Sequence, residues 1–182
     1  MSDKRILLLF TNHRVAEKLW PIIPKLAEFS KVDLFLVGLF SNQTPWIGDI
    51  DERQVVIQRY TPFINNIIFG PGVKFHGDNI SDDLSKYVDL DSYDLVIFDD
   101  NREMREFNIP NFYEKCKSKG ITVVGNPHGD EQFKKSGIGK SFDVRMVFGE
   151  KEQVLAPGSL TGGIPANDTL KGVKRNQKHI LI

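Results

Sequence analysis

The sequence has few of the features that mark secreted or nucleic-acid-binding proteins. Cys116 is the only cysteine among 182 residues, so no disulfide can form within the chain. The amino terminus carries Asp3, Lys4 and Arg5 in place of an apolar leader, and together with the single cysteine this predicts a cytoplasmic, reducing setting. Lys and Arg number 24, as do Asp and Glu, and a net charge of zero argues against a general nucleic-acid-binding protein.

Long apolar runs and the common cofactor motifs are also missing. The apolar run at residues 6–10 is far too short to span a bilayer. Gly139-Lys140-Ser141 resembles the end of a phosphate-binding loop, but Lys134 stands where that motif requires its first glycine. NAD and FAD sites require glycines directly after the first strand, and no glycine follows the first apolar run here. No pair of cysteines or histidines has the spacing of a zinc site. We therefore predict neither a cofactor nor a metal site.

The residues that are present are typical of a folded α/β domain. Apolar residues make up 40% of the chain and charged residues 26%, which is a globular composition. Continuous apolar runs at residues 5–10 and 32–40 predict buried parallel strands. Helical spacing of apolar residues between them predicts a helix over residues 14–29. Because Pro21 and Pro24 lie inside this segment, we expect a kink, or two short helices joined near Trp20.

The middle of the chain, residues 42–86, has the weakest pattern. Residues 55–58 are compatible with a short strand, residues 63–69 with a helical turn or a strand, and residues 73–75 with a third strand. Order returns in the second half, where strands are predicted at residues 94–98, 121–124 and 143–148, with helices at 110–119 and 130–136. This alternation predicts a Rossmann-like α/β fold, a doubly wound parallel sheet with helices on both faces.

The last part of the chain differs in composition. Residues 155–168 are rich in Gly and Pro and predict a loop, and residues 171–178 read as a polar linker. We expect residues 1–170 to form the Rossmann-like domain and residues 171–182 to be a linker and the first strand of a truncated second domain. Alternatively, the apolar run at residues 178–182 returns to the edge of the same sheet.

Three predicted strands end in polar residues, which suggests where a ligand binds. In doubly wound sheets, ligands bind outside the carboxyl ends of the strands, where the strand order reverses. We therefore expect the three segments that follow these strands to lie along one rim. Their polar residues are Thr11, Asn12, His13 and Arg14; Asp99, Asp100, Asn101 and Arg102; and Asn126, His128 and Asp130.

His128 is the leading candidate for chemistry at this rim. We expect the strand that ends at Val124 to run into a Gly-Asn-Pro turn that presents His128. Gly125 and Gly129 would permit tight turns and close approach of a ligand, and Pro127 would fix one dihedral before the histidine. A histidine held there can act as a general base near neutral pH. The alternative is a histidine that only hydrogen-bonds nearby loop backbone.

The other two segments give weaker candidates. His13, beside Arg14, could approach a phosphate or a sugar hydroxyl, but we favour a residue at a helix start without a ligand. Asp99 and Asp100 invite comparison with the strand-end aspartate of receiver domains. Such domains also need acidic residues after the first strand, where this chain has Thr11, so the comparison fails. Paired aspartates after a strand are often only turn residues and helix caps.

Two motifs stand out in the last third of the chain. The first is His128-Gly129, then Phe133-Lys134 and Gly137, then Phe142-Asp143 leading into a strand. The second is Gly163-Ile164-Pro165-Ala166-Asn167-Asp168-Thr169-Leu170. The first motif resembles the CDP-glycerol glycerophosphotransferases and, more broadly, GT-B glycosyltransferases and UDP-N-acetylglucosamine 2-epimerase-like proteins. The second is similar to the Gly-x-Pro-x-x-Asp-x-Leu segment before the interdomain linker of these proteins. Asp130 and Pro127 depart from the family's pattern.

The resemblance implies the N-terminal half of a GT-B fold. Such a domain mainly holds the acceptor and supplies a base, while a second domain holds most of the nucleotide-activated donor. His128 would deprotonate an acceptor hydroxyl, Gly129 would give the donor phosphate close backbone access, and Asp168 would be a structural turn residue. No metal is required. The resemblance thus assigns substrate binding to Gly129, and the expected convergence of the three strand ends adds Asn126, His13, Asn12 and Asp99 as predicted substrate-binding residues.

The function that the resemblance implies is transfer of a glycosyl or glycerol-phosphate group to a polyol or saccharide acceptor, in cell-wall or capsule polysaccharide synthesis. It also implies peripheral membrane association of the full protein and inactivity of this chain in isolation, while the balanced charge predicts no nucleic-acid partner. Two alternatives remain open: a sugar-nucleotide 2-epimerase-like domain, and a non-catalytic module that binds a small ligand.

Overall fold

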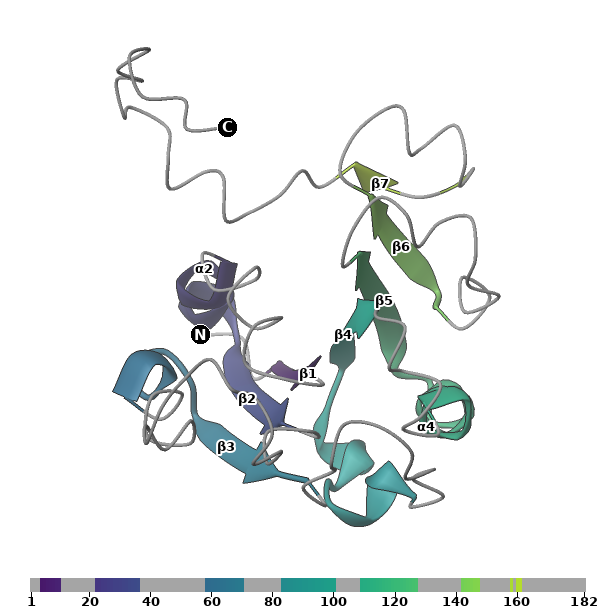
Figure 1. Ribbon diagram of the computed structural model, residues 1–182, viewed down its shortest axis with the longest axis horizontal. Coiled ribbons are helices and arrows are strands. Elements are labelled where there is room, and N and C mark those ends of the chain that lie inside the picture. The colour runs from purple at the N-terminus through teal and green to yellow at the C-terminus, as the bar shows by residue number, and fades with distance from the viewer. Residues whose placement is uncertain are drawn as a thin grey trace, which may run out of the picture.

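The computed structural model describes residues 4–10, 22–36, 58–70, 83–100, 109–127, 142–147, 158 and 160–161. Its strands form a sheet in the order β3-β2-β1-β4-β5-β6-β7, and every neighbouring pair is parallel (Figure 1). This arrangement confirms the predicted Rossmann-like α/β fold. The strands are β1 (Arg5–Phe10), β2 (Lys31–Leu36), β3 (Asn66–Phe69), β4 (Leu95–Asp100), β5 (Thr122–Pro127), β6 (Val144–Val147) and β7 (Leu160–Thr161).

The strong apolar runs of the sequence became strands, with small differences at their ends. β1 has its predicted bounds, and β2 covers most of the run predicted at residues 32–40, of which 37–40 lie outside the described residues. β4 continues two residues beyond its predicted end at Phe98, because Asp99 and Asp100 still pair with β5. β6 begins one residue later than predicted, at Val144.

The described part of the first predicted helix begins after its first proline. Helix α2 (Ile23–Phe29) carries Pro24 in its first turn, where a missing backbone N–H breaks no hydrogen bond. The helix ends at Ser30, whose N–H and hydroxyl both donate to the carbonyl of Leu26, at 3.0 and 2.7 Å. The predicted kink or break near Trp20 falls on residues 14–21, which lie outside the described part of the chain.

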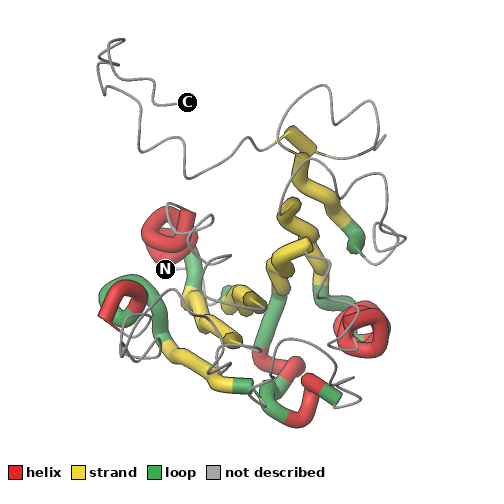
Figure 2. Tube along the Cα trace, in the orientation of Figure 1, coloured by secondary structure: helices red, strands yellow, loops and turns green. Residues whose placement is uncertain are grey.

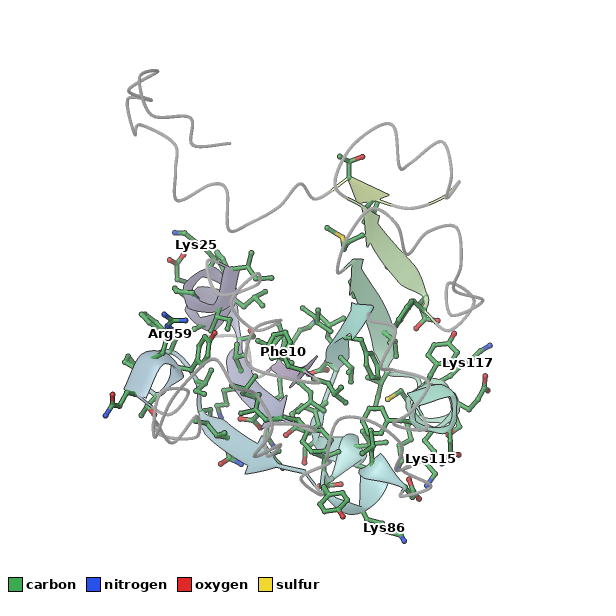
Figure 3. All side chains as sticks on the ribbon, viewed as in Figure 1. Phe10, Lys25, Arg59, Lys86, Lys115 and Lys117 are labelled. Atoms are coloured by element: carbon green, nitrogen blue, oxygen red, sulfur yellow. The ribbon has the colours of Figure 1, made fainter. Side chains whose placement is uncertain are left out.

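The other helical segments have clear local causes. Helix α4 (Ile109–Ser118) begins one residue before its prediction, and the chain leaves it through Gly120 at φ +72°, which favours glycine. The 3-10 turns η2 (Leu84–Lys86) and η3 (Leu90–Ser92) are capped by Asp83 and Asp89, whose carboxylates accept backbone N–H groups at 3.1 and 3.2 Å. Lys115 reaches from α4 to Asp83, which ties this helix to η2 (Figure 3).

Helical segments cover both faces of the sheet, and each face has its own apolar core (Figure 2). Successive side chains of a strand point to opposite faces, so the continuous run of β1 supplies both cores. Leu7 and Leu9 pack on the side of α4, η2 and η3, whereas Leu8 and Phe10 pack on the side of α2. Phe10 is fully buried in the interior (Figure 3).

Three weaker predictions need correction. Gln58 begins a helical turn at residues 58–60 and is not the end of a strand. Within residues 63–69, only residue 63 belongs to a turn and residues 66–69 form β3, so the strand alternative is confirmed and the helical-turn alternative is wrong. The Gly- and Pro-rich loop predicted at residues 155–168 contains β7, which pairs with β6 through Leu160 and Thr161. The predictions for residues 73–75, 130–136 and 171–182 lie outside the described residues.

Within the described residues, no helix has the length and apolar character needed to cross a membrane. The predicted domain boundary near residue 170 and the predicted start of a second domain fall on residues that lie outside the described part of the chain.

Cys116 is expected to be chemically inert in the folded protein. The thiol lies fully buried in α4, and burial, together with the nearby charge of Asp143, raises the pKa of Cys116 from 9.0 to about 12. A rise of about three pKa units lowers the thiolate fraction roughly a thousandfold at pH 8, and the thiolate is the reactive form. Labelling with 5,5′-dithiobis(2-nitrobenzoate) should therefore be slow in buffer and fast in urea. Rapid labelling without denaturant would contradict this placement.

Candidate functional site

The carboxyl ends of β1, β4 and β5 meet at one edge of the sheet. The three strands are neighbours in that order, and Leu9, Phe98 and Gly125 lie in one row of register partners. β1 ends one residue beyond this row, at Phe10, while β4 and β5 end two residues beyond it. From β1 the chain goes on to β2 on one side, and from β4 to β5 on the other, so the strand order reverses between β1 and β4. The predicted convergence of the three strand ends is confirmed for the backbone.

Two predicted site residues lie within this edge. Asp99 of β4 and Asn126 of β5 are Cα register partners in adjacent parallel strands. The segment with Asn12 and His13 begins directly after β1, and the segment with His128 and Gly129 begins directly after β5. These four residues lie outside the described part of the chain, as do the side chains of Asp99 and Asn126. The structure therefore shows that the strands carrying or preceding the candidate residues are neighbours, and it describes none of these side chains.

The interpretation of Gly125 as a turn residue was wrong. β5 continues through Pro127, and Gly125 is a strand residue paired with Phe98. A Cβ atom on Gly125 would lie 2.5 Å from Cδ2 of Phe142, so glycine is required here by the neighbouring ring. Phe142 also contacts Phe98, with ring centroids 5.9 Å apart. The Gly-Asn-Pro composition misled the prediction because the residue that explains Gly125 lies outside that stretch.

Gly125→Ala is accordingly expected to destabilise the protein by about 1–3 kcal/mol, the usual cost of forcing extra volume into a packed region. Urea unfolding should show this loss. In a Phe142→Ala background the ring is absent, so the same substitution should cost little or nothing more, as a double-mutant cycle would reveal. Equal losses in the two backgrounds would mean that the Phe142 ring is not the cause.

Asp143 holds the beginning of β6 against β5. β6 begins at Val144, which is the register partner of Val124 in β5. Val123 of β5 therefore has no partner within β6 and needs another hydrogen-bond partner on the β6 side of the strand. The carboxylate of Asp143 accepts the Val123 N–H at 2.8 Å, and its own N–H donates to the Val123 carbonyl at 3.0 Å. The hydroxyl of Tyr113 on α4 donates to the other carboxylate oxygen at 3.3 Å. Burial, reinforced by the charge of Asp143, raises the pKa of Tyr113.

The chain between β5 and β6 is therefore fixed at both ends. It leaves the sheet after Pro127, paired with Asp100, and returns at Phe142 and Asp143, which contact Gly125 and Val123. Sequence reasoning singled out Phe142 and Asp143 only through the family resemblance. An aspartate directly before an apolar run was the signal, but its hydrogen bonds could not be inferred without the strand pairing.

Two hollows among the described residues lie at the other end of the strands, where their amino ends are. One, of about 430 Å³, lies between η3 and the last turn of α4, where Lys119 pairs with Asp91. The other, of about 320 Å³, lies beside the exposed Phe29, at the amino ends of β1, β4 and β5. Neither adjoins the carboxyl edge that the fold assigns to ligands. No group of three potential metal-ligating side chains occurs within the parts of the chain that are described.

Comparison with known proteins assigns this chain to no family. No family model matches the chain, and no curated protein matches it either. Among solved structures, 2-dehydro-3-deoxygluconokinase from Thermotoga maritima is 13% identical, with a TM-score of 0.46 over 88% of this chain and 64% of the kinase. A cube-shaped, highly porous protein cage designed by fusing symmetric oligomeric domains is 13% identical, with a TM-score of 0.31 over 88% of this chain and 54% of the cage chain. The chain thus spans less than two thirds of either one, and likeness of this degree indicates no activity.

Proposed function

We propose that this chain is the acceptor-side domain of a transferase that moves a glycosyl or glycerol-phosphate group from a nucleotide-activated donor to a polyol or saccharide. The observation that carries the proposal is the meeting of the β1, β4 and β5 carboxyl ends at the reversal of strand order. That position is where open α/β sheets bind their ligands. The choice of transfer reaction rests on the resemblance of the segments around His128 and Asp168.

In this proposal the polar residues at and after the carboxyl ends of the three strands have distinct tasks. His128 is the general base that removes the proton of the attacking acceptor hydroxyl. Gly129 lets the donor phosphate approach the backbone closely. Acceptor hydroxyls are held by Asn12, His13, Asp99 and Asn126. The nucleotide of the donor is held mainly by a second domain, which faces this edge across a cleft.

Nuclear magnetic resonance titration of this chain tests whether the carboxyl edge binds ligand. Glycerol phosphate, CDP-glycerol and UDP-N-acetylglucosamine serve as separate probes. The proposal predicts amide shifts at Phe10, Asp99 and Asn126, which lie at or next to the carboxyl ends of the three strands, and none at Arg5 or Asp33 near the strand starts. Shifts confined to the strand starts would contradict it.

Two substitutions on β5 provide a matched pair for this titration. Asn126→Ala, near the carboxyl end of the strand, is expected to weaken binding about tenfold through loss of a hydrogen bond to the ligand. Thr122→Ala, at the exposed amino end of the same strand, should leave the affinity unchanged. Equal effects of the two changes would argue against a site at this edge. Binding of UDP-N-acetylglucosamine alone among the probes would favour the epimerase alternative.

A further inference from the structure

The apolar pattern of the central strands does not by itself determine how they pair. Residues 6–10 of β1 and residues 95–98 of β4 are apolar at every position, and β2 and β3 each end in three successive apolar residues. Such runs are expected for strands buried on both faces. A one-residue slip of a strand moves each side chain to the other face, and here it would mostly exchange one apolar residue for another. Something other than hydrophobicity must distinguish the observed register.

Asp33 is the feature that breaks this uniformity. It is the only charged side chain that is fully buried among the residues the structure describes. Its Oδ2 accepts from Nη2 of Arg5 at 2.6 Å and from the hydroxyl of Tyr93 at 2.7 Å, and its Oδ1 accepts from Nδ2 of Asn65 at 3.1 Å. The Arg5 guanidinium also stacks on the Tyr93 ring, 4.9 Å from its centroid. These contacts place a charged, directional group among apolar side chains.

The partners of Asp33 come from four different strands or their immediate approaches. Arg5 is the first residue of β1, and Asp33 is the third residue of β2. Asn65 directly precedes β3, and Tyr93 lies two residues before β4. We call these four residues the Asp33 network. It joins β1, β2, β3 and β4 at their amino ends, so each of their three pairings has a fixed reference point.

We propose that the Asp33 network sets the register of the four central strands. A one-residue slip of β2 would turn the Asp33 carboxylate into the core on the α2 side, where Val32 and Leu34 now pack. A two-residue slip would keep its face but move it about 6.6 Å along the strand, beyond hydrogen-bonding reach of Arg5 and Tyr93. Either slip leaves a buried carboxylate without its partners, which is strongly unfavourable. Only the observed register satisfies the group.

The test replaces the whole network by side chains that cannot hydrogen-bond: Arg5→Met, Asp33→Leu, Asn65→Ala and Tyr93→Phe in one variant. Apolar replacement of a complete buried ionic network is often neutral for stability. We therefore expect a melting temperature within about 4 °C of the parent. Amide signals of the four strands should nevertheless appear in more than one set, because slipped pairings become populated. Cross-strand nuclear Overhauser effects between Leu8 and Leu34 identify the parental pairing.

Asp33→Asn provides the matched control. It removes the charge but keeps an oxygen that can accept from Arg5 and Tyr93, so a single set of signals should remain at a lower melting temperature. A single set of signals with parental pairing in the fourfold variant would overturn the proposal. Failure of that variant to fold would overturn it too, because the network would then supply net stability and not register.

Discussion

Arg5→Met is expected to lower the free energy of unfolding by about 3–5 kcal/mol, the range measured when one partner of a buried ion pair is removed. The loss is large because Asp33 stays behind, with a fully buried side chain that solvent cannot reach. Arg5 itself is 31% exposed, so the reverse change, Asp33→Ala, leaves a guanidinium that water can still reach. That change should therefore cost less. The pKa of Arg5 is raised, chiefly by its hydrogen bond to Asp33, in keeping with this pairing.

Lys31→Met is the matched control for Arg5→Met. Lys31 is the register partner of Arg5 on the neighbouring strand, is also a long cation at a strand start, and is exposed. Its replacement should change stability by less than about 0.5 kcal/mol, as is usual at the surface. Urea unfolding of the three variants gives the comparison. Similar losses for Arg5→Met and Lys31→Met would refute the special role of the buried pair.

His128→Ala is expected to reduce kcat about 10²- to 10⁴-fold in a protein that joins this domain to a donor-binding second domain. The loss should fall on kcat and on kcat/KM alike, because a general base acts in the transition state and contributes little to substrate binding. The acidic limb of the pH–rate profile, which reports deprotonation of the base, should also disappear. The measurement is transfer of a radiolabelled group from CDP-glycerol or a UDP-sugar to acceptor.

His76→Ala is the control for this loss, since His76 has no role in the proposed site. Its transfer rate should equal that of the parent. Full activity in His128→Ala would remove His128 as the base, even if the titration shows ligand at the carboxyl edge. Those two results together would leave binding at the edge intact and the assigned chemistry refuted.

Local sequence was sufficient wherever a single run of residues determines the structure. Residues 5–10 form a strand because residues 6–10 are apolar throughout, and Gly120 ends a helix because it adopts positive φ. Local sequence failed where distant residues decide. Gly125 is explained by the ring of Phe142, and the partners of Asp33 lie 28, 32 and 60 positions away in the chain.

The candidate site shows the same division. That three strands end in polar residues can be read directly from the sequence, and the general rule for doubly wound sheets predicts that their ends meet. The strand order confirms this meeting, and it pairs Asp99 with Asn126, which no local pattern could specify. The tasks assigned to His128 and Gly129 depend on a partner domain and a ligand, so they stay predictions.

The residues that set the strand register and the residues proposed to bind ligand lie at opposite ends of the same strands. The Asp33 network lies at the amino ends, whereas the proposed binding residues lie at the carboxyl ends or directly after them. A lineage of such proteins could therefore exchange the segments after β1, β4 and β5 and acquire new substrates, while the arrangement of the sheet stays protected. Directed evolution has the same freedom: libraries that vary residues 11–13 and 128–130 should retain far more folded members than libraries that vary Arg5, Asp33 and Tyr93.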